Sequence, residues 1–156
     1  MLLGLETFSY HLALGRSQMD IFGFIERTRE LGLDGVQVNI GPARNTFGHL
    51  GSDDPGFIRE VCAAVESAGF FIEIDTRGTD YDFLTRVLKL CSAIGADVLR
   101  LYAAPEPDVS EVLQRAATDL VRIVPVCADL GVRIAFENHE HETSEDILGV
   151  VRQVDS

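Results

Sequence analysis

The strongest constraint on the fold is a regular alternation of short apolar runs with longer amphipathic runs along the whole chain. Runs rich in Val, Ile, Leu and Phe predict buried parallel strands over residues 2–9, 35–40, 70–75, 97–102 and 133–137. Between them, apolar residues at helical spacing predict helices over residues 19–31, 55–68, 81–94 and 109–130. An unbroken strand–helix order of this kind predicts a parallel sheet with right-handed crossovers.

Signals for helix starts and ends agree with this alternation. Ser17 with Asp20, and Thr143 with Asp146, have the spacing of a capping box at a helix start. Pro125 is expected to kink the fourth helix or to split it in two. Four glycines follow predicted helices and precede strands, as helix-ending residues do: Gly32, Gly69, Gly95 and Gly131. We therefore expect one run of βα units, forming a single domain over residues 1–156.

Two architectures share this order of elements. One is a complete doubly wound sheet of five strands, of the flavodoxin type, whose usual size matches 156 residues. The other is the first part of an eight-unit (β/α) barrel, which needs about 250 residues when complete. Periodicity does not separate the two. In both, ligands bind at the carboxyl ends of the strands, so the residues found there must decide.

Composition narrows the classes of partner. Thirteen Lys and Arg against 25 Asp and Glu give a net charge of −12, which repels phosphate backbones and anionic lipid. We therefore expect neither nucleic acid nor a membrane surface as a partner. No apolar run approaches the roughly 20 residues of a membrane span, and no basic segment of a signal peptide follows Met1. Three scattered cysteines without a CxxC motif fit a reducing compartment, so we expect a cytoplasmic protein.

Polar side chains gather where the predicted strands end. His11 follows the first strand, as a substrate contact or as a histidine that caps the barrel floor. His49 lies in the loop after the second strand, where a solvent-exposed histidine is more common than a lid contact. Asp75 ends the third strand and could accept a substrate hydroxyl, while Arg100 near the end of the fourth could hold hydroxyl or phosphate oxygens. A structural ion pair between Asp75 and Arg100 is an equal alternative.

Glu137 is the most informative of these residues. It occupies the last inward position of the fifth predicted strand, where a carboxylate is costly unless it is paired or bound to a cation. His139 and His141 follow at the same period of two, so an extended segment would align three potential metal ligands. His139 could instead contact substrate, and His141 is more easily read as an exposed turn residue. The alternative for the whole segment is a solvated acidic turn.

Several other chemistries lack their motifs. The chain contains no GxGxxG or GxxxxGK[ST] sequence for nucleotide phosphates and no GxSxG nucleophile elbow. The segment after the first strand also lacks the Ser, Thr and Gly residues that a flavodoxin-like sheet uses to bind a phosphate. These absences weaken the doubly wound alternative.

Three stretches, taken in order, resemble the xylose isomerase-like barrels, the superfamily of sugar-phosphate isomerases and epimerases. The run Ile134-Ala-Phe-Glu137-Asn138-His139 is similar to the family's fifth strand, which ends in a Glu that binds the catalytic divalent metal. Residues 3–9 resemble the opening strand, and residues 31–36 resemble the entry to the second strand. The resemblance implies an α/β fold of parallel (β/α) units, an incomplete TIM barrel with about five of the eight units.

The resemblance also implies a reaction. The family's metal is held by carboxylates and a histidine from the fifth to eighth strands, and of these this chain contains only Glu137. A site for Mn, Mg, Co or Zn would therefore be incomplete here. In the epimerases this Glu and one from the eighth strand transfer the proton next to a carbonyl, through an enediolate. With Glu137 as metal ligand and catalytic group, the expected substrate contacts are His11, His139, Arg100 and Asp75.

The resulting hypothesis is the N-terminal part of a divalent-metal-dependent isomerase or epimerase that acts on a sugar or sugar phosphate. The alternative from another class is a non-catalytic, five-stranded α/β domain that binds a small molecule or a partner. Within the superfamily, a metal-dependent dehydratase or decarboxylase of sugar acids is a further alternative. A partial barrel would expose its first and fifth strands as edges, so we also expect self-association through them.

Overall fold

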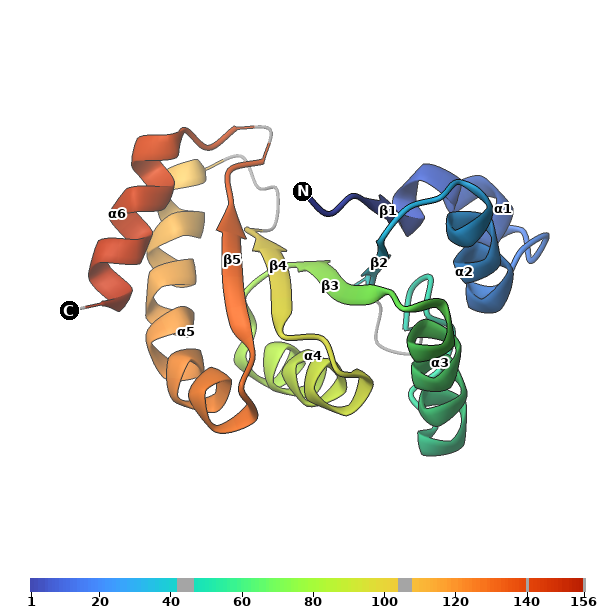
Figure 1. The fold of residues 1–156 in the computed structure, drawn as a ribbon. Coiled ribbons are helices and arrows are strands. Elements are labelled where there is room, and N and C mark those ends of the chain that lie inside the picture. Colours follow the sequence, from blue (N-terminus) through green and yellow to red (C-terminus); the bar gives the residue numbers. More distant parts are fainter. Residues whose placement is uncertain (42–46, 104–107, 140, 156) are drawn as a thin grey trace. The chain divides into compact units, whose positions relative to one another are not determined.

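A computed structural model describes residues 1–41, 47–103, 108–139 and 141–155 of the chain (Figure 1). Five strands alternate with helices along the sequence, which confirms the predicted α/β class of parallel (β/α) units. None of the described helices is long and apolar enough to cross a membrane. The chain forms two compact units, which are described separately: unit 1 is Met1–Asp75 with Ala93–Ala96, and unit 2 is Thr76–Ser92 with Asp97–Ser156.

Unit 1 contains three parallel strands and the helices that connect them. Strand β1 (Gly4–Glu6) pairs with β2 (Gly35–Asn39), and β2 pairs with β3 (Phe71–Arg77) over residues 71–75. Val36 and Val38 on one face of β2 are fully buried, whereas Gln37 and Asn39 on the other face are half-buried. The helices of this unit are α1 (His11–Gly15), α2 (Ile21–Glu30) and α3 (Pro55–Ala68).

The Phe71 side chain fills the amino-terminal end of this polar strand face. The register places Gly4, Gly35 and Phe71 side by side on three neighbouring strands. A Cβ atom at Gly4 would lie 2.8 Å from Phe71 Cζ, and a Cβ atom at Gly35 would overlap the same ring. Both positions therefore require glycine because the aromatic ring lies across the two strands. The polar residues of β2 and β3 come next along the strands, toward their carboxyl ends.

Unit 2 contains strands β4 (Val98–Tyr102) and β5 (Arg133–Glu137), which pair in parallel with Tyr102 opposite Glu137. Leu99 and Leu101 on one face of β4 are fully buried. The alternate positions, Arg100 and Tyr102, lie on the opposite face and are partly exposed. The helices are α4 (Tyr81–Ile94), which belongs to this unit up to residue 92, α5 (Val109–Leu130) and α6 (Ser144–Val154), which packs beside α5 (Figure 1).

The first strand is shorter than predicted. Residues 2–9 were expected to be extended, but the backbone leaves the strand after Glu6 and enters the 3₁₀ helix η1 (Thr7–Tyr10), followed at once by α1. The reason lies in long-range contacts that bring the Thr7 hydroxyl to the backbone N–H of Asn39, at 2.9 Å. A tertiary hydrogen bond of a buried Thr thus overrides the apolar pattern of the segment.

Pro125 does not split the fourth helix, because α5 is continuous from Val109 to Leu130; of the two predicted effects the split is wrong, and the kink stays a prediction. Proline removes one backbone donor and leaves the carbonyl four residues earlier without its helical partner. That carbonyl belongs to Val121, which is 49% exposed, so water can satisfy it. The helix therefore continues past the proline.

Of the two predicted capping boxes, one is confirmed and one is wrong. Thr143 and Asp146 form the complete reciprocal box at the start of α6. At α2 the N-cap is Asp20 itself, whose carboxylate accepts from the N–H of Gly23 at 2.8 Å. Ser17 instead follows Arg16, the C-cap of α1, with a positive φ of 54°, and its backbone N–H donates to the carbonyl of Leu14. The predicted helix-ending glycines all have positive φ: Gly32, Gly69, Gly95 and Gly131.

Candidate functional site

In unit 1, neutral amides bind the carboxylates on the polar face of the strands. Asn39 Nδ2 donates to Asp75 Oδ2 at 2.9 Å. Two residues earlier on both strands, Gln37 Nε2 donates to Glu73 Oε2 at 3.0 Å. Asp75 is only 1% exposed, so its carboxylate depends on such partners for stabilisation. The sequence pointed to Asp75 as a hydroxyl acceptor or an arginine partner, and it gave no indication of this amide contact.

A second contact in unit 1 joins the ends of β1 and β2. The Oγ1 atom of Thr7, which is fully buried, lies 3.0 Å from Nδ1 of His49 and also accepts the backbone N–H of Asn39. Burial lowers the pKa of His49, and the nearby charge of His11 lowers it further. His49 is therefore an anchored side chain, whereas sequence reasoning favoured a solvent-exposed histidine.

His11 lies at the carboxyl end of β1, in the position expected for a substrate contact. It begins α1, and its Nδ1 is 2.8 Å from the carbonyl oxygen of Phe8. Its ring stacks on the Phe8 ring with 4.9 Å between centroids, and Phe8 is 57% exposed. Phe71 lies at the amino-terminal end of the strand face, and both proposed roles of His11, a substrate contact or a cap of the barrel floor, stay predictions.

In unit 2, the two central polar residues form a close ion pair. Arg100 Nη2 donates to Glu137 Oε1 at 2.9 Å, and Arg100 Nε lies 2.6 Å from the buried Glu137 Oε2, an ionic contact that is not a hydrogen bond. The side chains are 26% and 30% exposed, so the pair is partly withdrawn from water. A two-point contact between a planar guanidinium and a carboxylate fixes the orientation of both groups. Glu137 is therefore not part of a solvated turn but a paired and oriented carboxylate.

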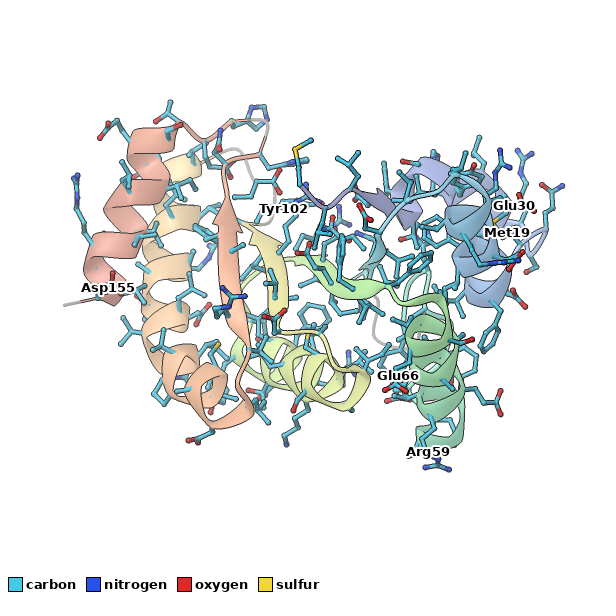
Figure 2. All side chains as sticks on the ribbon, in the orientation of Figure 1. Met19, Glu30, Arg59, Glu66, Tyr102 and Asp155 are labelled. Carbon is cyan, nitrogen blue, oxygen red and sulfur yellow. The ribbon has the colours of Figure 1, made fainter. Side chains whose placement is uncertain are left out.

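His139 and Tyr102 complete the group around this pair. His139 Nδ1 is 3.8 Å from Glu137 Oε1, and the His139 ring lies on the Tyr102 ring with 4.2 Å between centroids. Figure 2 shows Tyr102 at the carboxyl end of β4. The backbone N–H of His139 donates to Glu142 at 3.1 Å, which holds the segment after β5. The ion pair thus has an imidazole and a phenol ring beside it.

His141 does not join this group as a third ligand. It lies in the turn after β5, where its backbone N–H donates to the carbonyl of His139 at 2.7 Å. Among the described residues, no three His, Cys, Asp or Glu side chains are placed to hold one metal ion. The three potential ligands Glu137, His139 and His141 are therefore not brought together in this structure.

The donors that are present nevertheless suit a divalent ion. A carboxylate from Glu137 and an imidazole from His139 are ligand types that Mn, Co and Zn accept together, and Mg takes the carboxylate. The distance of 3.8 Å between their nearest donor atoms is close enough for both to contribute to one site. These residues can supply part of a metal site, and the remaining ligands would have to come from elsewhere.

Parallel βα units with polar residues at the carboxyl ends of the strands fit both a doubly wound sheet and a TIM barrel, and the family match decides for the TIM-barrel class. Residues 25–156 match the family described as xylose isomerase-like TIM barrel, and the chain belongs to this family. The family resemblance seen in the sequence is thereby confirmed.

Individual relatives agree with this assignment. The chain is 23% identical over 155 residues to the uncharacterized protein YihM of Escherichia coli strain K12, covering 97% of this chain and 46% of YihM. Its fold is similar to that of a D-psicose 3-epimerase from Clostridium cellulolyticum H10, solved with D-tagatose, with a TM-score of 0.73 and 16% identity. That match covers 99% of this chain and 60% of the epimerase.

Two further structures extend the comparison. A sugar phosphate isomerase/epimerase from Parabacteroides distasonis has a TM-score of 0.65 and 13% identity, over 97% of this chain and 60% of its own. A xylose isomerase-like TIM barrel protein from Mycobacterium smegmatis, solved in complex with magnesium, has a TM-score of 0.62 and 16% identity, over 86% and 52%. The chain thus spans about half of YihM and little more than half of each of these structures.

Proposed function

We propose that this chain is the N-terminal part of a divalent-metal-dependent isomerase or epimerase that acts on a sugar or a sugar phosphate. The reaction would move a proton next to a carbonyl group, through an enediolate. The observation that carries the proposal is Glu137, which is oriented by Arg100 at the carboxyl end of β5 and has His139 at 3.8 Å. The sugar isomerase and epimerase structures that share this fold support it.

Each residue of the group has a separate role in this proposal. Glu137 is the metal ligand of this chain and a carrier of the transferred proton. Arg100 holds the carboxylate in one orientation through its two contacts, and it is also a candidate for binding substrate oxygens. His139, stacked on Tyr102, presents its imidazole as a substrate contact. A divalent ion held here would supply positive charge beside the substrate carbonyl.

His11 and Asp75 belong to unit 1, and their proposed substrate roles rest on the family resemblance. Asp75 is almost fully buried and bound by Asn39, which favours an indirect role in positioning over direct contact. The further metal ligands and the second proton-transfer group would come from strands other than the five that the structure describes. We therefore expect residues 1–156 alone to show negligible turnover.

The proposal extends to partners and location. A net charge of −12 disfavours nucleic acid and anionic membranes, which leaves a small sugar as the expected ligand in a cytoplasmic protein. Within the described part of the chain β1 pairs with β2, and β5 pairs with β4. If the outer sides of β1 and β5 are open, they would promote self-association of the isolated chain.

Manganese binding tests the role of Glu137 without requiring turnover. In NMR spectra of the 156-residue chain, Mn²⁺ is expected to broaden the signals of Glu137, His139 and Tyr102 first, because a paramagnetic ion acts over short distances. Glu137→Gln removes the anionic ligand and is expected to raise the Mn²⁺ concentration needed for this broadening about tenfold or more.

Asp97→Asn is the matched control for this experiment. Asp97 also pairs with an arginine of β5, at 2.7 Å from Arg133, but it lies at the amino ends of the strands and is well exposed. The control should leave the broadening near Glu137 unchanged. Broadening spread evenly over the acidic surface, or equal in wild type and Glu137→Gln, would count against the proposed metal site.

A further inference from the structure

Two histidines of unit 1 present opposite hydrogen-bonding groups beside one exposed aromatic ring. The first is His49, whose protonation is set by Thr7. The Thr7 hydroxyl is fully buried, its oxygen accepts the N–H of Asn39, and His49 Nδ1 is the acceptor within reach of its single proton. Because a buried hydroxyl donates when an acceptor is in reach, Nδ1 of His49 accepts. The neutral ring then carries its proton on Nε2, as a donor.

His11 has the opposite arrangement. Its Nδ1 lies 2.8 Å from the carbonyl oxygen of Phe8, and a carbonyl oxygen can only accept. Nδ1 of His11 therefore carries the proton, and in the neutral ring Nε2 is left as an acceptor. The two histidines thus offer one donor and one acceptor nitrogen.

The Phe8 ring links the two histidines. Its centroid lies 4.9 Å from that of His11, nearly parallel at 17°, and 6.4 Å from that of His49. With 57% of its surface exposed, Phe8 is a large apolar side chain that stays accessible at the end of β1. An aromatic ring with a few fixed polar groups around it is the usual composition of a small-molecule subsite.

We propose that Phe8, His11 and His49 form a subsite for the neutral, hydroxyl-bearing end of a sugar. His49 Nε2–H donates to a hydroxyl oxygen, His11 Nε2 accepts a hydroxyl proton, and Phe8 packs against the carbon–hydrogen face of the chain. This assignment rests on the proposed function for its ligand class, and it adds His49 to the residues that recognise substrate.

The same groups are poorly suited to a phosphate. Phosphate oxygens require several N–H donors or a fixed cation, as arginine provides. With both rings neutral, the three residues of this subsite offer a single donor nitrogen, and the acceptor lone pair of His11 would face a phosphate oxygen with repulsion. Burial also lowers the pKa of His49, which keeps its ring neutral near pH 7. The subsite therefore selects for hydroxyl groups, which can both donate and accept.

The first test measures which nitrogen carries the proton. Long-range ¹H–¹⁵N NMR spectra of the histidine rings in the 156-residue chain should show His49 protonated on Nε2 and His11 protonated on Nδ1. Thr7→Val removes the hydroxyl with little change of shape. It should abolish the preference of His49 for a proton on Nε2 and leave the preference of His11 for a proton on Nδ1. A His49 ring protonated on Nδ1 in the wild-type chain would overturn the inference.

The second test measures binding with D-fructose as the neutral probe and inorganic phosphate as the anionic one. D-fructose should shift the His11 and His49 ring signals in a saturable way, and phosphate should not. His49→Asn keeps an acceptor for Thr7 but loses the Nε2–H donor, so it should weaken D-fructose binding about tenfold. His141→Asn, which removes a histidine of unit 2, should change it less than about twofold.

These outcomes are separable from those for Glu137. If Mn²⁺ localises at Glu137 but D-fructose leaves His11 and His49 unaffected, the subsite is wrong and the proposed function stands. If D-fructose shifts the signals of both rings but Mn²⁺ does not broaden those of Glu137, the proposed function fails and the sugar subsite remains. Phosphate that shifts the two rings as strongly as D-fructose does would overturn the selectivity for hydroxyl groups.

Discussion

The two compact units present different chemistry on the strand faces that carry their polar residues. In unit 1, Asn39 and Gln37 bind carboxylates through neutral amide groups, and the Phe71 ring fills the amino-terminal end. In unit 2, β4 and β5 are bridged twice by arginine and carboxylate, at their amino ends through Arg133 and at their carboxyl ends through Arg100. One face is fixed by neutral hydrogen bonds and the other by charge.

This difference indicates two kinds of ligand. Neutral donors and acceptors held by buried partners, such as Thr7 and His49, select neutral polar groups by geometry. A partly exposed carboxyl group such as that of Glu137 offers oxygen atoms for which a metal cation can compete with Arg100. A sugar isomerase that depends on a metal needs both properties, so the contrast agrees with the proposed function. Substitutions can test each half of the comparison.

The largest effect is expected from Gly35→Ala in unit 1. The added methyl group would overlap the Phe71 ring, which must leave its place over β1 and β2. Such overpacking against the Phe71 ring should lower the free energy of unfolding by about 2–3 kcal/mol. Urea denaturation followed by circular dichroism measures this change.

Gly149→Ala is the control from unit 2. Gly149 lies within α6, and a Cβ there would meet no atom within 4 Å. Alanine favours the helix over glycine, so this change should raise the free energy of unfolding by about 0.5–1 kcal/mol. If Gly35→Ala were as harmless as this control, Phe71 would not be the fixed apolar layer that distinguishes unit 1.

An intermediate effect is expected from the two arginine pairs of unit 2. A double-mutant cycle with Arg100→Met and Glu137→Gln should give a coupling energy of about 1–2 kcal/mol, because the pair is joined by a charge-assisted hydrogen bond and is 26% and 30% exposed. The same cycle on Arg133 and Asp97, which are 75% and 69% exposed, should give less than about 0.5 kcal/mol.

The dependence on ionic strength separates the coupling energies of the two ion pairs further. Raising the ionic strength screens exposed charges more than partly buried ones, so the Arg133–Asp97 coupling should vanish first. Equal coupling energies for the two pairs, measured by denaturation in low salt, would contradict the view that Arg100 orients Glu137 more firmly than an ordinary surface ion pair.

The parts of the fold that follow from local pattern could be predicted from the sequence. The bounds of β5, α3, α4 and α5 agree with the predicted ranges, because apolar periodicity, a proline at the start of α3 and terminal glycines all act locally. Glu137 was identified in the same way. A carboxylate at the last inward position of a strand required a cationic partner, and the structure provides Arg100.

Contacts between distant residues could not be predicted. Thr7 and His49 are 42 positions apart, and neither stands in a motif that indicates the other. The same holds for Asn39 and Asp75, because an amide bound to a carboxylate leaves no pattern in a single sequence. The pairing of Arg100 with Glu137 depends on which strands are neighbours and on register, which β4 and β5 supply only once they are paired. These contacts make up most of the candidate site.

The smallest expected effect is the pH dependence of stability that His49 causes. Burial lowers the pKa of His49 below its ordinary value of 6.5, so the folded chain binds a proton there less readily than the unfolded chain does. Its contribution to stability is therefore complete above about pH 6.5 and is lost as the pH falls through the folded-state pKa. His49→Asn keeps the acceptor for Thr7 but cannot titrate. Urea midpoints of wild type and His49→Asn should therefore run parallel above pH 7 and converge or cross below pH 6.5, where the wild type loses stability faster. Parallel curves over the whole range would show that His49 is as accessible to protons as in the unfolded chain. His49 would then not belong to the neutral hydrogen-bonding groups that distinguish unit 1.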